Sequence, residues 1–156
     1  MPIDPLIYPV AAAKTPLAIL PPADDFTLVA RTTDATPTRL TADGLAPNAA
    51  NTGNLPSFSA ASGRLFVTAR CESGGNGKAS WAFDVMFRRD TSVATCSASP
   101  PTAAATAPQL VAGTVTGWSV TVDSSETNGG LSVTVAGVAG QTVKWSARFV
   151  GVDSGW

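Results

Sequence analysis

The sequence of 156 residues contains no histidine, the residue that most often serves as a general base or as a metal ligand in proteins. Charged residues make up only 13% of the chain, about half the usual share, and the formal net charge is −1. Nucleic-acid-binding domains usually carry a clear excess of basic residues. We therefore expect neither histidine-dependent catalysis nor a nucleic-acid partner.

Long apolar segments are also missing. No apolar run approaches the ~20 residues that a membrane-spanning helix needs. The first residues, MPIDPLIY, lack the basic start and the continuous apolar stretch of a secretory signal peptide, because prolines interrupt them. We expect no membrane span and no signal peptide in this segment.

Cysteine is scarce, and the two that are present, Cys71 and Cys96, match no metal-ligand spacing. Two interpretations stay open for them: buried thiols that pack as small apolar side chains, or a disulfide. A catalytic thiol is not expected, because no imidazole is available to activate it. Phosphate-binding loops and nucleophile elbows are absent as well. We therefore predict that the chain is not an enzyme and has no catalytic residues and no cofactor.

Proline and glycine are abundant, with 12 and 14 residues, and six of the prolines fall within the first 22 residues. Proline at this density prevents both a regular helix and a central strand. The same segment has too many apolar residues for a plain solvated tail. We predict that residues 1–25 form an extended arm lying in a groove of this domain or of a neighbouring subunit, the alternative being an arm that is disordered in isolation. Its candidate contact residues are Ile7, Tyr8, Val10, Leu17, Ile19 and Leu20.

From residue 26 onwards, apolar and polar residues alternate in several segments. The clearest are residues 64–71 and 80–88, and in the second of these Trp81, Phe83 and Phe87 share one face. Period-two alternation predicts half-buried antiparallel strands, here joined by a glycine-rich hairpin loop at residues 72–78. Further strands are predicted at residues 26–31, 37–41, 91–96, 118–122, 131–135 and 143–149, with a loop or short linker at 97–107. Eight or nine strands without a helix favour an all-β fold, an antiparallel β-sandwich or jelly-roll-like domain spanning residues 26–156.

Three features of this domain are candidate sites. Residues 42–56 form a long predicted loop, which makes them a candidate functional or interface loop. Residues 123–128 collect two carboxylates and an amide; we interpret them as a solvated hairpin loop rather than as a calcium site, and expect no metal. Finally, Arg64, Asp84 and three candidate interface residues would share one mixed aromatic and charged face if the strand register allows it. These three interface candidates are Phe66, Arg70 and Arg88.

The last third of the chain carries a family resemblance. Residues 117–122 form an aromatic strand, GWSVTV, which is followed by a polar loop with Thr127 and Asn128. A Leu-x-Val-x-Val-x-Gly strand at 131–137 and a Thr-Val-x-Trp-x-Ala strand at 142–147 complete the pattern. In this order the segment resembles the closing part of virion surface and appendage proteins of tailed bacteriophages, namely tail fibre, tail spike and head spike proteins. Upstream, RTTDATPTRL at residues 31–40 resembles the opening of the same module.

The resemblance implies a non-enzymatic virion structural protein, either a head decoration or spike component or a tail fibre component, that acts through assembly and surface display. It implies other virion proteins of the capsid or tail as partners, and further copies of the chain in a trimer or pentamer. The implied location is the virion, assembled in the host cytoplasm and with this protein exposed on the particle. The alternative function is a lectin-like module that binds a carbohydrate or receptor such as a host surface glycan.

Overall fold

The computed structural model describes residues 25–48, 51–55, 57–91, 94–99, 107–125 and 130–153. These residues form ten β-strands, and no helix occurs among them. None of the described segments is therefore a helix long and apolar enough to cross a membrane. The predicted arm lies outside the described residues except for Asp25, which begins the first strand. The arm's candidate contact residues, Ile7, Tyr8, Val10, Leu17, Ile19 and Leu20, are all outside them.

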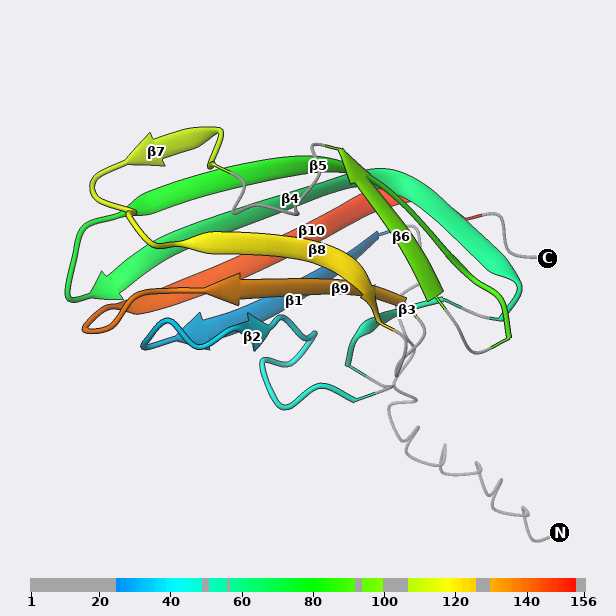
Figure 1. Cartoon of the computed structure of the whole chain (residues 1–156), viewed down its shortest axis with the longest axis horizontal. Coiled ribbons are helices and arrows are strands. Elements are labelled where there is room, and N and C mark those ends of the chain that lie inside the picture. The colour runs from blue at the N-terminus through cyan, green and yellow to red at the C-terminus, as the bar shows by residue number, and fades with distance from the viewer. Residues whose placement is uncertain are drawn as a thin grey trace, which may run out of the picture.

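Two antiparallel sheets make up the domain (Figure 1). The strands are β1 (Asp25–Thr32), β2 (Thr38–Arg39), β3 (Gly53–Asn54), β4 (Ser59–Ser73), β5 (Lys78–Arg89), β6 (Ala94–Ser99), β7 (Leu110–Ala112), β8 (Ser119–Ser125), β9 (Gly130–Ala136) and β10 (Thr142–Asp153). The six-stranded sheet has the order β1-β10-β4-β5-β6, with β7 pairing the other half of the same edge of β5. In the four-stranded sheet, β8 pairs with β9, and β9 also pairs with β2 and β3.

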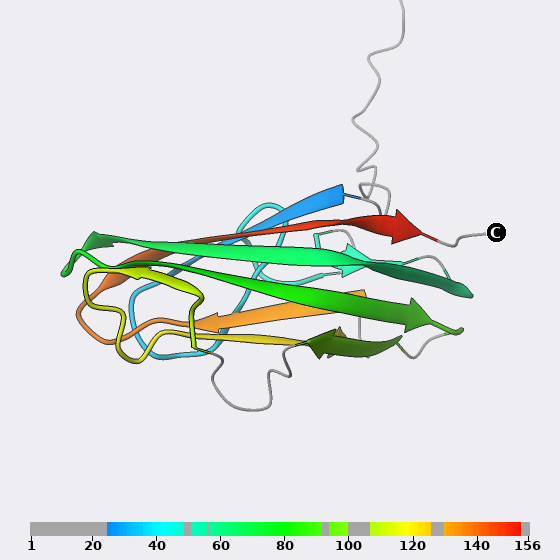
Figure 2. The same ribbon diagram turned by 90° about the horizontal axis from the view of Figure 1, so that it is seen from above.

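The two sheets stack as layers, which Figure 2 shows edge-on. The chain passes between the sheets on going from β1 to β2, from β3 to β4, from β7 to β8 and from β9 to β10. The antiparallel β-sandwich expected from the alternating sequence is confirmed.

Aromatic side chains from both sheets fill the space between the layers. Trp145 on β10 is fully buried, and its ring lies 5.7 Å from that of Trp81 on β5 and 5.6 Å from that of Trp118, which precedes β8. The indole N–H of Trp145 donates a hydrogen bond to the Thr32 hydroxyl at 2.9 Å. Because the buried polar atom has a partner, the large ring can be buried without an unsatisfied donor. The core positions predicted from alternation, Trp81, Phe83 and Phe87, are all buried.

The hairpin predicted at residues 72–78 joins β4 to β5, the two long central strands. Gly74 in its loop has a φ of 79°, a conformation that glycine adopts without strain. A Cβ at this position would collide with the carbonyl oxygen of Gly140 in the β9–β10 turn. Glycine at this position therefore allows the two turns to pack together.

Several predicted boundaries need correction. The strand predicted at 37–41 is reduced to β2, two residues long, with an isolated bridge from Thr41 to Val29. β6 continues to Ser99, so residues 97–99 are strand and not the predicted linker. β3 and β7 were not predicted, because each is only two or three residues long and shows no alternation.

The predicted loop at 42–56 is an ordered connection that contains β3. Its centre is Asn51, which is buried: the side chain accepts a hydrogen bond from the backbone N–H of Asn48 at 2.7 Å and donates one to Asp43 at 2.9 Å. Hydrogen bonds of this kind hold a loop in one conformation and explain why a polar side chain is tolerated in the interior.

The two cysteines are not bonded to each other, and both are half-buried free thiols. Cys96 pairs with Phe87, whose partner on β4 is Ala61, ten residues from Cys71. Ten strand residues span roughly 33 Å, whereas a disulfide needs Cα atoms within about 7 Å. Of the two interpretations left open by the sequence, an intramolecular disulfide is therefore ruled out by the fold.

Candidate functional site: the outer face of the six-stranded sheet

The face of the six-stranded sheet that points away from the four-stranded sheet carries the most distinctive exposed residues; we call it the outer face. Along β4, the inward residues Leu65, Val67 and Ala69 are buried, while Arg64, Phe66, Thr68 and Arg70 between them are exposed. The same alternation runs along β5 and β10. Strand periodicity therefore presents every second side chain of three long strands on one surface.

Large apolar side chains gather on one half of this face. They are Phe66 on β4, Met86 on β5, and Val150 and Val152 on β10, with 44%, 58%, 44% and 71% of their surface exposed. Met86 and Val152 both lie opposite Ser62 in register, and Val150 lies diagonal to Phe66. We call these four residues the apolar patch. Grouped apolar residues on an exposed sheet face are typical of surfaces that contact another molecule.

A charged pair lies within the apolar patch, in the register row between Phe66 and the row of Met86 and Val152. Arg64 lies opposite Asp84, with its Nε atom 3.8 Å from a carboxylate oxygen, and its guanidinium carbon is 5.6 Å from the centre of the Phe66 ring. Both charges are exposed, so the pair contributes little to the free energy of unfolding. The pair matters for the position of the charge, because Arg64 lies opposite Val150 and holds a cation over the Phe66 ring in the middle of the patch.

A second ion pair ties β1 to β10 beside the patch. Arg148 donates two hydrogen bonds to the Asp25 carboxylate, from Nε at 3.0 Å and from a terminal nitrogen at 2.6 Å. The hydrogen bond from Arg148 lowers the pKa of Asp25, and the same contact raises the pKa of Arg148. Asp25 is also in register with Val150, so the chain N-terminal to β1 joins the domain at the apolar patch.

Phe58 is an exposed aromatic in an unusual backbone conformation, at the end of β4 that lies beyond Ser62. Its φ is 61°, and it is the one non-glycine residue with positive φ in the part of the chain that the structure describes. Two thirds of the side chain is exposed. Its backbone N–H donates to the carbonyl of Asp90 at 3.1 Å, and the hydroxyl of neighbouring Ser57 donates to that of Thr91. The strain stored in such a residue is characteristic of contact and functional sites.

The three interface residues predicted on the domain all lie on the outer face, but they do not form one cluster. Arg70 is opposite Lys78 and Arg88 is opposite Ala60, near the two ends of β5. Ten strand residues, roughly 33 Å, separate these positions. Only Phe66 belongs to the apolar patch, and Arg88 forms an exposed pair with Asp90 at 3.4 Å. The sequence did not lead us to predict Met86, Val150 and Val152 as contact residues. The alternation that places Phe87 and Phe149 inward nevertheless requires Met86 and Val150 to point outward, and Val152, two residues after Val150, points the same way.

No group of three or more metal-ligating side chains comes together among the described residues. Residues 126–128 of the predicted hairpin loop at 123–128 lie outside the described residues.

The Cys96 thiol has a raised pKa of about 11. The main cause is burial of the thiol, and the negative charge of Asp123 is the second cause. A thiol with so high a pKa is almost entirely protonated at neutral pH, which makes it a poor nucleophile.

Comparison of the chain with protein-family models and with curated protein sequences found no match.

Proposed function

We propose that this chain is a non-enzymatic structural protein of a tailed-bacteriophage virion, a head decoration or spike component or a tail fibre component. It acts by assembly: the β-sandwich packs against further copies of itself through the outer face, and the N-terminal arm docks onto a neighbouring capsid or tail protein. Surface display on the particle is the result. The observation that carries the proposal is the apolar patch of Phe66, Met86, Val150 and Val152 on the outer face.

Three further features support an assembly role. Arg64 and Asp84 lie side by side at the patch, so around a threefold or fivefold axis the arginine of each copy can pair with the aspartate of the next. The arm precedes Asp25, which pairs with Val150 at the patch, and this supports the proposal that arm and patch contact the same neighbour. Low overall charge is also typical of proteins that lose surface to subunit contacts.

The patch is tested with a double substitution, Met86→Lys and Val152→Lys, in the full chain. Both side chains point outward, so the fold should be retained while association is weakened at least tenfold. Sedimentation velocity over a range of concentrations measures the association. Leu45→Lys is the matched control, since Leu45 is 69% exposed but lies in the loop after β2, away from the patch. Unchanged association of the double variant would contradict the proposal.

Phe58 allows a second test in which stability and association change in opposite directions. Glycine adopts positive φ without strain, so Phe58→Gly should leave the unfolding free energy unchanged or raise it by about 1 kcal/mol. If Phe58 is a contact residue, the same substitution weakens association. A variant that is destabilised and associates normally would show that Phe58 has only a structural role.

A further inference from the structure

Four basic residues form a single register row across the outer face, at the end away from the apolar patch. Arg31 on β1 lies opposite Lys144 on β10, Lys144 lies opposite Arg70 on β4, and Arg70 lies opposite Lys78 on β5. All four are exposed. We call them the basic row. Neighbouring strands are about 4.8 Å apart, so the row extends over roughly 14 Å at right angles to the strands.

Most of this positive charge is not neutralised by the described part of the chain. Glu72 pairs with Arg31 at 2.9 Å. Arg70, Lys78 and Lys144 form no ion pair with another described residue. Like charges placed directly opposite on neighbouring strands lower stability. A chain with only 10 basic residues and a net charge of −1 nevertheless places four of them in one row, which indicates a role in binding an anion.

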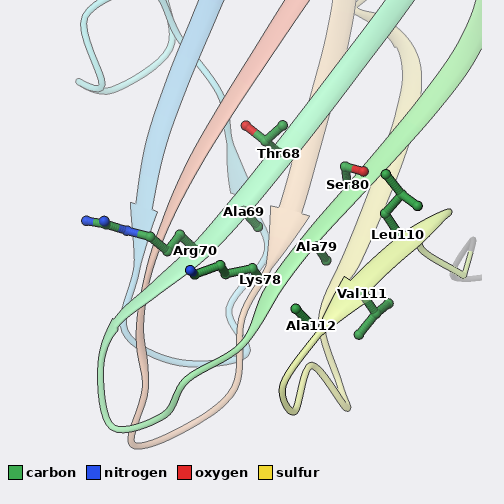
Figure 3. Close-up of a pocket in the computed structure, with 9 residues that line it drawn as sticks. All are labelled: Thr68, Ala69, Arg70, Lys78, Ala79, Ser80, Leu110, Val111 and Ala112. Carbon is green, nitrogen blue, oxygen red and sulfur yellow. The ribbon is translucent and has the colours of Figure 1, made fainter.

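Three shallow hollows follow the basic row from strand to strand. The first, of about 270 Å³, is lined by Arg31 and Lys144, and the second, of about 240 Å³, by Lys144 and Arg70. The third, of about 380 Å³, is lined by Arg70 and Lys78 and extends to the apolar side chains of Leu110, Val111 and Ala112 on β7. Figure 3 shows Arg70 and Lys78 next to each other on β4 and β5, with the exposed side chains of β7 beyond. Each hollow shares a basic residue with the next, so the three lie side by side along the basic row, and we call them together the trough.

Hydroxyl groups line the same trough. Ser146, Thr68 and Ser80 lie opposite one another on β10, β4 and β5, two residues along the strands from the basic row. No aromatic side chain lies in either row, whereas single-stranded nucleic acids are usually bound by stacking on aromatic rings. β4 and β10 are central strands with both edges paired, so an acidic peptide cannot add here as a further strand. Cations beside hydroxyls suit a ligand that carries both negative groups and hydroxyls.

We propose that the trough along the basic row binds an anionic polysaccharide, a chain of sugars that carry carboxylate or sulfate groups. The negative groups contact Lys144, Arg70 and Lys78, and the sugar hydroxyls exchange hydrogen bonds with the row of Ser146, Thr68 and Ser80. The site is independent of the assembly proposal, because it occupies the opposite half of the outer face and uses none of the patch residues. Arg70, predicted as an interface residue, belongs to this row.

The test compares two polyanions with the same number of carboxylates, polygalacturonate and polyglutamate, with neutral dextran as a third probe. Titration calorimetry on the full chain should give tighter binding of polygalacturonate, weakened by added salt, and no binding of dextran. Arg70→Gln should weaken this binding about fivefold, and the double variant Lys78→Gln with Lys144→Gln about 25-fold. Arg148→Gln is the matched control: it removes an arginine four residues away on β10 and should change the affinity by less than about twofold.

Thr68→Val tests the contribution of the hydroxyl row to binding apart from that of the basic row, since it removes one hydroxyl and leaves every cation in place. It should weaken polygalacturonate binding about threefold and leave polyglutamate binding unchanged. Equal or tighter binding of polyglutamate or of a single-stranded oligonucleotide by the unmodified chain would overturn the assignment to a polysaccharide. Normal polygalacturonate binding by both charge variants would overturn the site itself. Melting curves of each variant establish that the fold is retained.

Discussion

At the scale of single residues, Trp145 shows most directly which properties of a core residue the sequence predicts and which it does not. Alternation in residues 143–149 predicted that its ring points inward, and it is fully buried. Its hydrogen bond to Thr32 could not have been predicted, because the two residues are 113 positions apart and meet only through the pairing of β1 with β10. Local pattern thus determines which face a side chain takes, whereas its polar partner depends on the fold.

Trp145→Ala should lower the free energy of unfolding by about 3–5 kcal/mol, because it leaves a large cavity between Trp81 and Trp118. Trp145→Phe retains most of the apolar volume and loses the bond to Thr32, so its cost should be smaller, about 1–3 kcal/mol. Guanidinium unfolding monitored by circular dichroism gives both values. A loss below ~1 kcal/mol for the alanine variant would place the ring outside the core.

Cys96 should be unreactive in the folded protein. Its pKa is raised from 9.0 to about 11, so at pH 8 the reactive thiolate is about 100-fold less populated in the folded chain than in the unfolded chain. In a Cys71→Ser variant, labelling by a maleimide reagent should therefore be at least 100-fold slower than in denaturant. Equal rates in the two conditions would mean that the thiol is neither buried nor influenced by Asp123.

The same shift has a consequence for stability. A raised folded pKa means that the neutral thiol is favoured by the fold, so its contribution is present below pH 9 and is lost as the pH rises from 9 towards 11. Asp25 behaves in the opposite sense: its lowered pKa means that the contribution of its pair with Arg148 is present near neutral pH and is lost under acid conditions, as the carboxylate becomes protonated.

At the scale of strands, the sequence predicted the long elements well and the short ones poorly. β4, β5, β9 and β10 each show period-two alternation over most of their length, and their faces are as expected. β3 and β7 have no periodicity to detect and exist because β9 and β5 offer them unpaired edges. Register between strands was equally beyond prediction, so neither the apolar patch nor the basic row could be assembled from the sequence alone.

The pairing of β4 with β10 depends on a close contact between glycines. Gly63 lies opposite Gly151, and a Cβ on Gly63 would collide with the backbone of Val150 and Gly151. Gly63→Ala should therefore lower the free energy of unfolding by about 1–3 kcal/mol, although alanine is normally no worse than glycine in a strand. Ser62→Ala, at the neighbouring exposed position, is the control and should change it by less than ~0.5 kcal/mol in the same denaturation measurement. Equal effects of the two substitutions would contradict the close approach.

At the scale of the whole molecule, the two halves of the outer face differ in chemistry. The half near the start of β1 carries the apolar patch with the Arg64–Asp84 pair within it. The other half carries the basic row and its hydroxyls, with exposed Leu110 beside them on β7. A surface divided in this way suits a protein that packs against its neighbours through one half and leaves the other half accessible to a ligand. Both assignments use side chains that contribute little to the core, so they can be altered without unfolding the sandwich.

Assembly is the central claim, and the absolute mass of the chain in solution tests it most directly. Light scattering on the full chain and on a version that begins at Asp25, the start of β1, gives both masses. We predict that the full chain has three or five times the mass of one chain, and that the shortened version remains folded but has a lower mass. A full chain that is monomeric at every concentration, with the same mass per chain after shortening, would contradict the account.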